Sequence, residues 1–128
     1  MSKTTKSILI VEDSPTQAMH LQTLLQSEGL KVLLAHNGKA GVQLARQTIP
    51  DVIILDLEMP ELNGFQVCQQ LKGIETTADI PVILFTRHDD REAVVLGLQV
   101  GAIEFIPKDA FADAVLLETL RQMGVIET

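Results

Sequence analysis

The chain has 128 residues and a formal net charge of −7 at pH 7; 46% of its residues are hydrophobic but only 3% are aromatic. This length matches one domain with a mainly aliphatic core, and the negative charge argues against nucleic-acid binding through the domain as a whole. No apolar stretch approaches the roughly 20 residues of a membrane span. The polar start is too short for a signal peptide, and the single cysteine, Cys68, excludes an internal disulfide.

We therefore expect a cytoplasmic, single-domain protein with no membrane partner. Its predicted parts are a flexible N-terminal segment over residues 1–6, one domain over 7–124 and a C-terminal tail over 125–128. The apolar pair Val125 and Ile126 follows Gly124, and we expect it to be exposed, either fraying or serving as a weak contact for a partner.

Five short apolar runs recur along the chain, at residues 8–11, 32–35, 52–55, 82–85 and 102–106. Runs of this length, rich in β-branched and aliphatic residues, are typical of buried strands. Glu104 interrupts the last run, as an edge strand with one wet face allows.

The segments between and after these runs show helical spacing of apolar residues. Residues that favour a helix start precede four of them: Ser14, Asn37, Asp89 and Asp109. The first start also has Pro15 at the first helical position and Gln17 where a capping box places glutamine. Strands and helices that alternate five times indicate an α/β fold, with a parallel sheet covered by helices on both faces.

Charged or hydroxyl side chains stand at or after the ends of four of the five runs. They are Glu12 and Asp13, Asp56, Thr86, and Lys108. The carboxyl ends of parallel strands share one edge of the sheet, so these groups are expected to converge in one crevice. Adjacent acids repel each other and resist burial, and Mg²⁺, which prefers oxygen ligands, would offset both penalties. The pattern predicts a divalent-metal and phosphoryl-transfer site.

Each of these residues also has a simpler interpretation. Asp13 could assist the helix cap at Ser14, and Asp56 could serve as a turn residue rather than as a nucleophile that forms an acyl phosphate. Thr86 could be structural, and Lys108 could be a solvated surface lysine. The coincidence of all of them at strand ends favours the functional reading.

The combination resembles the receiver domain of two-component response regulators, in its CheY-like, stand-alone form. The resemblance rests on residues 8–13, 51–60, 63–64, 101–102 and 105–108 together with Thr86. It implies a flavodoxin-like (βα)5 three-layer sandwich, whose five-stranded parallel sheet has the order 2-1-3-4-5.

The resemblance also implies roles for the site residues. Asp56 would accept a phosphoryl group from a phosphohistidine on a sensor histidine kinase or a histidine phosphotransfer protein. The metal Mg²⁺ would be held by Asp13, Asp56 and the backbone carbonyl of Glu58, with Glu12 acting through water. The chain would be a signalling phosphoacceptor, not an enzyme, and its chemistry would be limited to its own phosphorylation and autodephosphorylation.

A switch is implied as well. Lys108 would offset charge on the phosphoryl oxygens, Thr86 would move toward them, and Phe105 would follow inward unless it is ordinary core packing. The surface of the fourth helix, fifth strand and fifth helix would then change. That surface would contact an unknown protein target or form a weak dimer of an otherwise monomeric chain.

Two residues, Arg87 and Asp109, depart from the family pattern, and two more, Glu58 and His88, occupy positions that vary within the family. Arg87 stands where receivers usually have a small residue; it either points to solvent or gates access to the phosphoryl group. Glu58 and His88 border the path of the hydrolytic water and are expected to modulate dephosphorylation, unless His88 is merely solvated. Asp109 replaces a proline that often follows a cis bond, and is expected to cap the last helix instead.

Three other functions are less compatible with the sequence. A phosphorylation-independent adaptor with the same fold has no need of the complete set of site residues. A nucleotide-binding enzyme would carry a glycine-rich loop after the first strand, where this chain has Glu12 and Asp13. A haloacid-dehalogenase-type phosphohydrolase would carry a second aspartate where Glu58 stands.

Overall fold

The structure is a computed structural model, and it describes residues 5–87 and 90–127. Within these residues five strands form one sheet: β1 Ser7–Val11, β2 Lys31–Ala35, β3 Val52–Leu55, β4 Val82–Thr86 and β5 Glu104–Pro107. All neighbouring strands are parallel, in the order β2-β1-β3-β4-β5. The predicted α/β fold and strand order are confirmed, and Glu104 is exposed on the edge strand β5, as expected.

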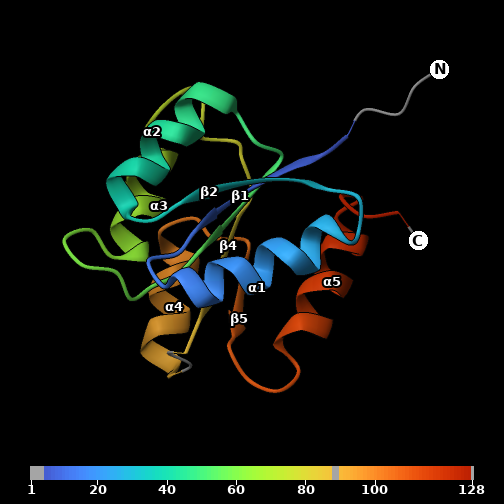
Figure 1. Ribbon diagram of the computed structural model, residues 1–128. Coiled ribbons are helices and arrows are strands. Elements are labelled where there is room, and N and C mark those ends of the chain that lie inside the picture. The colour runs from blue at the N-terminus through green and yellow to red at the C-terminus, as the bar shows by residue number, and fades with distance from the viewer. Residues whose placement is uncertain (1–4, 88–89, 128) are drawn as a thin grey trace.

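Helices cover both faces of this sheet (Figure 1). They are α1 Pro15–Gln26, α2 Gly38–Thr48, α3 Gly64–Lys72, α4 Arg91–Gln99 and α5 Ala112–Gln122. In Figure 1, α1 and α5 lie on one face, whereas α2, α3 and α4 lie on the other. None of the helices in the described ranges is long and apolar enough to cross a membrane.

Alternating side chains of the strands supply one aliphatic core on each face. In β1, Ile8 and Ile10 belong to the core that includes Leu25 of α1, and Leu9 belongs to the core that includes Leu71 of α3. All of these side chains are fully buried. A sheet buried on both faces explains why the strands read as continuous apolar runs instead of alternating patterns.

Two of the four expected helix caps, Ser14 and Asn37, are confirmed. Ser14 Oγ accepts from the Gln17 amide at 3.4 Å, and Asn37 Oδ1 accepts from the Ala40 amide at 2.7 Å. The start expected at Asp89 lies outside the described residues; the cap of α4 that the structure shows is Asp90, which accepts from the Ala93 amide. The sequence reading missed the cap of α3, where Asn63 and Gln66 form a complete capping box.

The last helix begins differently from the prediction. Asp109 Oδ1 accepts from the Phe111 amide at 2.8 Å, and the helix starts only at Ala112 without a side-chain cap. Asp109 therefore closes the turn ahead of α5 and does not cap the helix. The peptide between Lys108 and Asp109 is trans.

The expected exposure of the C-terminal pair is also wrong. Ile126 is only 6% exposed and belongs to the core beneath α1 and α5, with Val125 packed against it. The Val125 amide donates to the Leu120 carbonyl at 2.9 Å. An apolar pair just after a helix end can fold back onto the core, because the turn at Gly124, whose φ is +80°, redirects the chain.

Gly64, the first residue of α3, holds the loop after β3 close to the sheet. A Cβ at this position would lie 2.5 Å from the Asp56 carbonyl oxygen and 2.9 Å from Leu57 Cα. Gly64→Ala should therefore destabilise the fold by about 1–3 kcal/mol, because backbone atoms must shift. Gly73→Ala is the matched control, since its Cβ would meet only ordinary contacts at 3.6 Å. Urea unfolding measures both; equal stabilities would contradict the close approach at Gly64.

Candidate phosphoryl-transfer site

The pairing of β1 with β3 places two acids side by side at the carboxyl edge of the sheet. Val11 and Leu55 are register partners at the ends of these strands, and the next residues are Glu12 and Asp56. The Asp56 amide donates to the Val11 carbonyl at 3.0 Å, which fixes this register. Glu12 is 2% exposed and Asp56 is 8% exposed.

Asp13 completes a cluster of three carboxylates. One oxygen from each of Glu12, Asp13 and Asp56 lies within 4.8 Å of the others. Asp13 is exposed to solvent, whereas the other two are buried. Three hard oxygen ligands at this spacing, one of them open to water, fit a partly hydrated Mg²⁺ ion.

Lys108, which directly follows β5, brings a positive charge to the three carboxylates. Its backbone amide donates to the Thr86 carbonyl at 2.7 Å, which ties the start of the β5–α5 loop to β4. Its ammonium donates to Glu12 Oε1 at 2.6 Å and to Gln17 Oε1, and lies 3.5 Å from Asp56 Oδ2. The ammonium also lies 5.8 Å from the centre of the Phe85 ring, within cation–π range.

The pKa of Glu12 reflects two opposing influences: burial and repulsion by Asp56 act in one direction, and attraction to Lys108 acts in the other. Burial is the largest cause that raises the pKa of Glu12, and Asp56 raises it further, while Lys108 lowers it. One ammonium cannot neutralise three carboxylates, so a divalent cation would relieve the remaining repulsion. The donor set therefore fits the metal that the sequence predicts.

The loop after β3 orients the expected phosphoacceptor. The Glu58 amide donates to Asp56 Oδ1 at 3.2 Å, while Asp56 Oδ2 faces Lys108. The Glu58 side chain is exposed at the rim of the site. Its expected influence on dephosphorylation stays a prediction, as does that of His88, which lies outside the described residues.

The two expected switch residues lie on neighbouring strands. Thr86 is the last residue of β4 and is completely buried. Phe105 is half-buried in β5, where its register partner is Leu84. A Cβ on Gly97 of α4 would lie 3.3 Å from the Phe105 ring, so this ring packs under α4. Both the switch role and plain core packing are compatible with this position.

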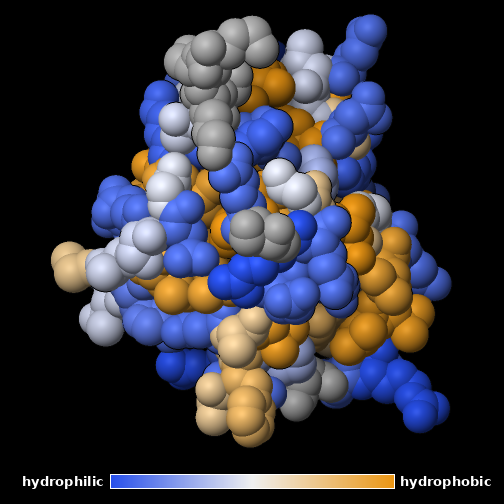
Figure 2. All heavy atoms as spheres, turned by 90° about the vertical axis from the view of Figure 1, so that its right-hand side faces the viewer, coloured by the Kyte–Doolittle hydropathy of each residue, from blue (hydrophilic) through white to orange (hydrophobic). Residues whose placement is uncertain are grey.

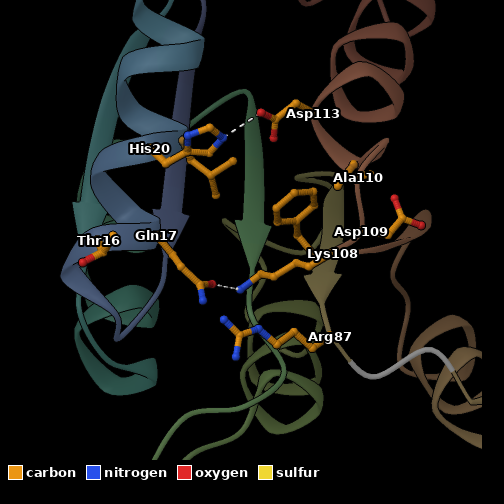
Figure 3. Close-up of a pocket in the computed structure, with 11 residues that line it drawn as sticks. Thr16, Gln17, His20, Arg87, Lys108, Asp109, Ala110 and Asp113 are labelled. Carbon is orange, nitrogen blue, oxygen red and sulfur yellow. Dashed lines mark hydrogen bonds and ion pairs between the residues drawn. The ribbon is translucent and has the colours of Figure 1, made fainter.

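Two hollows meet at the site. A cleft of about 350 Å³ is lined by Glu12, Asp13, Ser14, Gln17, Asp56, Glu58, Arg87 and Lys108. A neighbouring cavity of about 460 Å³ lies between α1 and the β5–α5 loop (Figure 3). Arg87, Gln17 and Lys108 line both hollows, and Figure 3 shows the exposed Arg87 beneath the Gln17–Lys108 contact.

Gln17 was assigned by sequence only to a capping box, and that assignment is wrong. The amide of Ser14 donates to Glu12 Oε2 at 3.3 Å, and the Gln17 side chain reaches Lys108 instead. No local signal could show this, because Gln17 and Lys108 are 91 residues apart in the sequence.

Comparison with known proteins agrees with this geometry. The family model of the response regulator receiver domain matches residues 8–121. The chain therefore belongs to the response regulator receiver domain family, the class of two-component signalling modules that its fold and acidic site indicate.

Individual relatives support the same assignment. Protein PilH of Pseudomonas aeruginosa is 44% identical over 109 residues, which cover 85% of this chain and 90% of PilH. The chemotaxis protein CheY4 of Vibrio cholerae has a similar structure, with a TM-score of 0.86 and 28% identity over 93% of this chain and 98% of that one.

A third relative bears on the metal. The receiver domain of the sensor histidine kinase PA1611 from Pseudomonas aeruginosa, described with a magnesium ion coordinated in its active-site cleft, superimposes with a TM-score of 0.84. It is 27% identical, and the match covers 93% of this chain and 97% of that one.

If Asp13 is a metal ligand, Mg²⁺ should stabilise the wild type and stabilise Asp13→Asn much less. At a metal concentration of 100 times the dissociation constant, the gain in unfolding free energy is about 2.7 kcal/mol. Urea unfolding with and without Mg²⁺ measures it. Glu75→Gln, an exposed acid before β4 at the opposite edge of the sheet, should keep the full gain. An equal gain in Asp13→Asn would contradict the assignment.

Proposed function

We propose that this chain is a phosphorylation-switched response regulator, which accepts a phosphoryl group on Asp56 from a phosphohistidine of a sensor kinase or histidine phosphotransfer protein. One observation carries the proposal: a buried carboxylate stands between two further acids and one ammonium at the edge of a parallel sheet. Membership of the receiver family supports it.

In the proposed transfer, a carboxylate oxygen of Asp56 attacks the phosphorus of the phosphohistidine. A phosphorus–oxygen bond forms and the phosphorus–nitrogen bond breaks, while the imidazole nitrogen leaves with the electron pair and takes up a proton. Hydrolysis later returns the carboxylate and releases phosphate. The chain then acts as a phosphoacceptor with self-catalysed chemistry, not as an enzyme that turns over a substrate.

The residues around Asp56 would together stabilise the negative charge of the phosphoryl oxygens. Asp13, Asp56 and the Glu58 carbonyl would hold Mg²⁺, with Glu12 acting through water, and the ion would supply positive charge against the phosphoryl oxygens. Lys108 would supply the second positive charge, and positioned charges of this kind account for most of the acceleration of phosphoryl transfer. The Glu58 amide holds Asp56 Oδ1, which limits rotation of the nucleophile.

The output would be a change in the surface formed by α4, β5 and α5. Thr86 and Phe105 connect the site to this surface, because Phe105 packs under Gly97 of α4. Large apolar side chains are exposed on and beside these elements, among them Val95, Leu98, Ile103 and Val115. Figure 2, which views the α5 side, shows apolar side chains gathered toward one flank of a mostly hydrophilic face. This surface suits a protein target or a weak dimer.

Phosphorylation can be tested directly. Incubation with acetyl phosphate and Mg²⁺ should add one phosphoryl group to the wild type and none to Asp56→Asn, because only the carboxylate can form the acyl phosphate. Intact-mass spectrometry measures the adduct. No adduct on the wild type would favour the phosphorylation-independent adaptor, and an adduct on Asp56→Asn would place the phosphoacceptor elsewhere.

The exposed Arg87 should slow loss of the phosphoryl group, because it lines the cleft that holds Asp56 and carries a positive charge. An exposed charge contact contributes about 0.2–1 kcal/mol, so Arg87→Ala should shorten the phosphorylated lifetime by about twofold to fivefold. Decay of the phosphorylated mass in time measures this. Arg91→Ala, on exposed α4, is the control. An unchanged lifetime in Arg87→Ala supports a solvated arginine.

A further inference from the structure

We propose that Gln17 is a positioning residue that holds the Lys108 ammonium on the Glu12 side of the cleft until a phosphoryl group arrives at Asp56. This inference rests on the proposed function and concerns a residue that the phosphoryl-transfer chemistry itself does not require.

The hydrogen bonds of the Lys108 ammonium favour Glu12 and Gln17 over Asp56. Its ammonium donates hydrogen bonds to Glu12 Oε1 and to Gln17 Oε1, whereas Asp56 Oδ2 lies 3.5 Å away, beyond ordinary hydrogen-bond distance. Figure 3 shows Gln17 extending from α1 toward Lys108. Both acceptors of these hydrogen bonds therefore lie in α1 or in the loop before it, and neither lies in the loop after β3 that carries Asp56.

A comparison within the chain shows that the Gln17 conformation is specific to this site. Gln66 occupies the equivalent third position of α3, and its side chain reaches back to the Asn63 amide at 2.9 Å. At the start of α1 the corresponding amide of Ser14 is bound by Glu12 Oε2 instead. Because Glu12 takes over this part of the cap, the Gln17 amide group is released to contact Lys108.

The chemistry of an amide suits a reversible hold. Lys108 has three hydrogens to donate, and a neutral amide oxygen competes with a charged phosphoryl oxygen less strongly than a carboxylate does. Gln17 can thus keep the ammonium ordered in a cleft that is open to solvent. The hydrogen bond between Gln17 and Lys108 would break when the phosphoryl group binds. Part of the free energy of the phosphoryl–Lys108 contact would then be spent in breaking the Gln17 contact.

Removal of the Gln17 acceptor should therefore favour the phosphorylated form. Beryllofluoride is a suitable probe, since it mimics the phosphoryl group and is described as activating a related receiver domain. A hydrogen bond to a charged group corresponds to about tenfold in an equilibrium constant, and water can partly replace Gln17. With saturating Mg²⁺, Gln17→Ala and Gln17→Met should bind beryllofluoride about threefold to tenfold more tightly than the wild type.

The two Gln17 variants, one control variant and a measurement of Mg²⁺ affinity separate positioning from a structural effect. Gln17→Met keeps the length of the side chain but removes the acceptor, and Gln66→Ala removes the equivalent glutamine of α3. Titration calorimetry should give wild-type beryllofluoride affinity for Gln66→Ala and wild-type Mg²⁺ affinity for both Gln17 variants. Unchanged or weaker beryllofluoride binding by Gln17→Met would overturn the inference.

The same titrations distinguish failure of the phosphoacceptor role from failure of the Gln17 role. If the phosphoacceptor role fails, the wild type would bind no beryllofluoride in the presence of Mg²⁺, or Asp56→Asn would bind it equally well. If the wild type binds and Asp56→Asn does not, the phosphoacceptor role stands, and the ratio between the wild type and Gln17→Met decides the role of Gln17 alone.

Discussion

The structure depends on one electrostatic constraint: two carboxylates, Glu12 and Asp56, are buried next to each other at the edge of a parallel sheet. Such a pair is unfavourable unless positive charge is supplied. Lys108 supplies part of it by a 2.6 Å ion pair with Glu12, and the exposed Asp13 leaves an opening through which a cation can approach. The repulsion that Lys108 leaves unrelieved would favour binding of a divalent cation such as Mg²⁺.

Strand pairing and backbone hydrogen bonds set the positions of the charged groups in the site. Parallel pairing of β1 with β3 places Glu12 beside Asp56. The hydrogen bond from the Lys108 amide to the Thr86 carbonyl places Lys108 at the same edge of the sheet. The sheet packs against an aliphatic core on each of its faces. The close approach of Gly64 to the Asp56 carbonyl holds the loop that carries Glu58. In the proposed switch, a change of charge at Asp56 would pass across this sheet to side chains such as Phe105 on the edge strand β5.

Much of the fold could be predicted because its signals are local. Strand runs, the caps at Ser14 and Asn37, and the alternation of elements depend on neighbours within a few residues. One error arose because the residues have distant partners, and the other because two local capping patterns look alike in the sequence. The apolar pair Val125 and Ile126 looked exposed after Gly124 but packs on the core, and Asp109 closes a turn where a cap was expected.

The sequence by itself determined the class of fold and the identity of the groups at the carboxyl edge, because the strand ends and their acids are readable from apolar runs and the residues that follow them. Only the tertiary structure decided how those groups share hydrogen bonds. Lys108 lies 96 residues from Glu12 and 91 from Gln17 along the chain. Which acceptors engage its ammonium depends on how the crossover connections bring α1 and β5 together, and no local pattern encodes that choice.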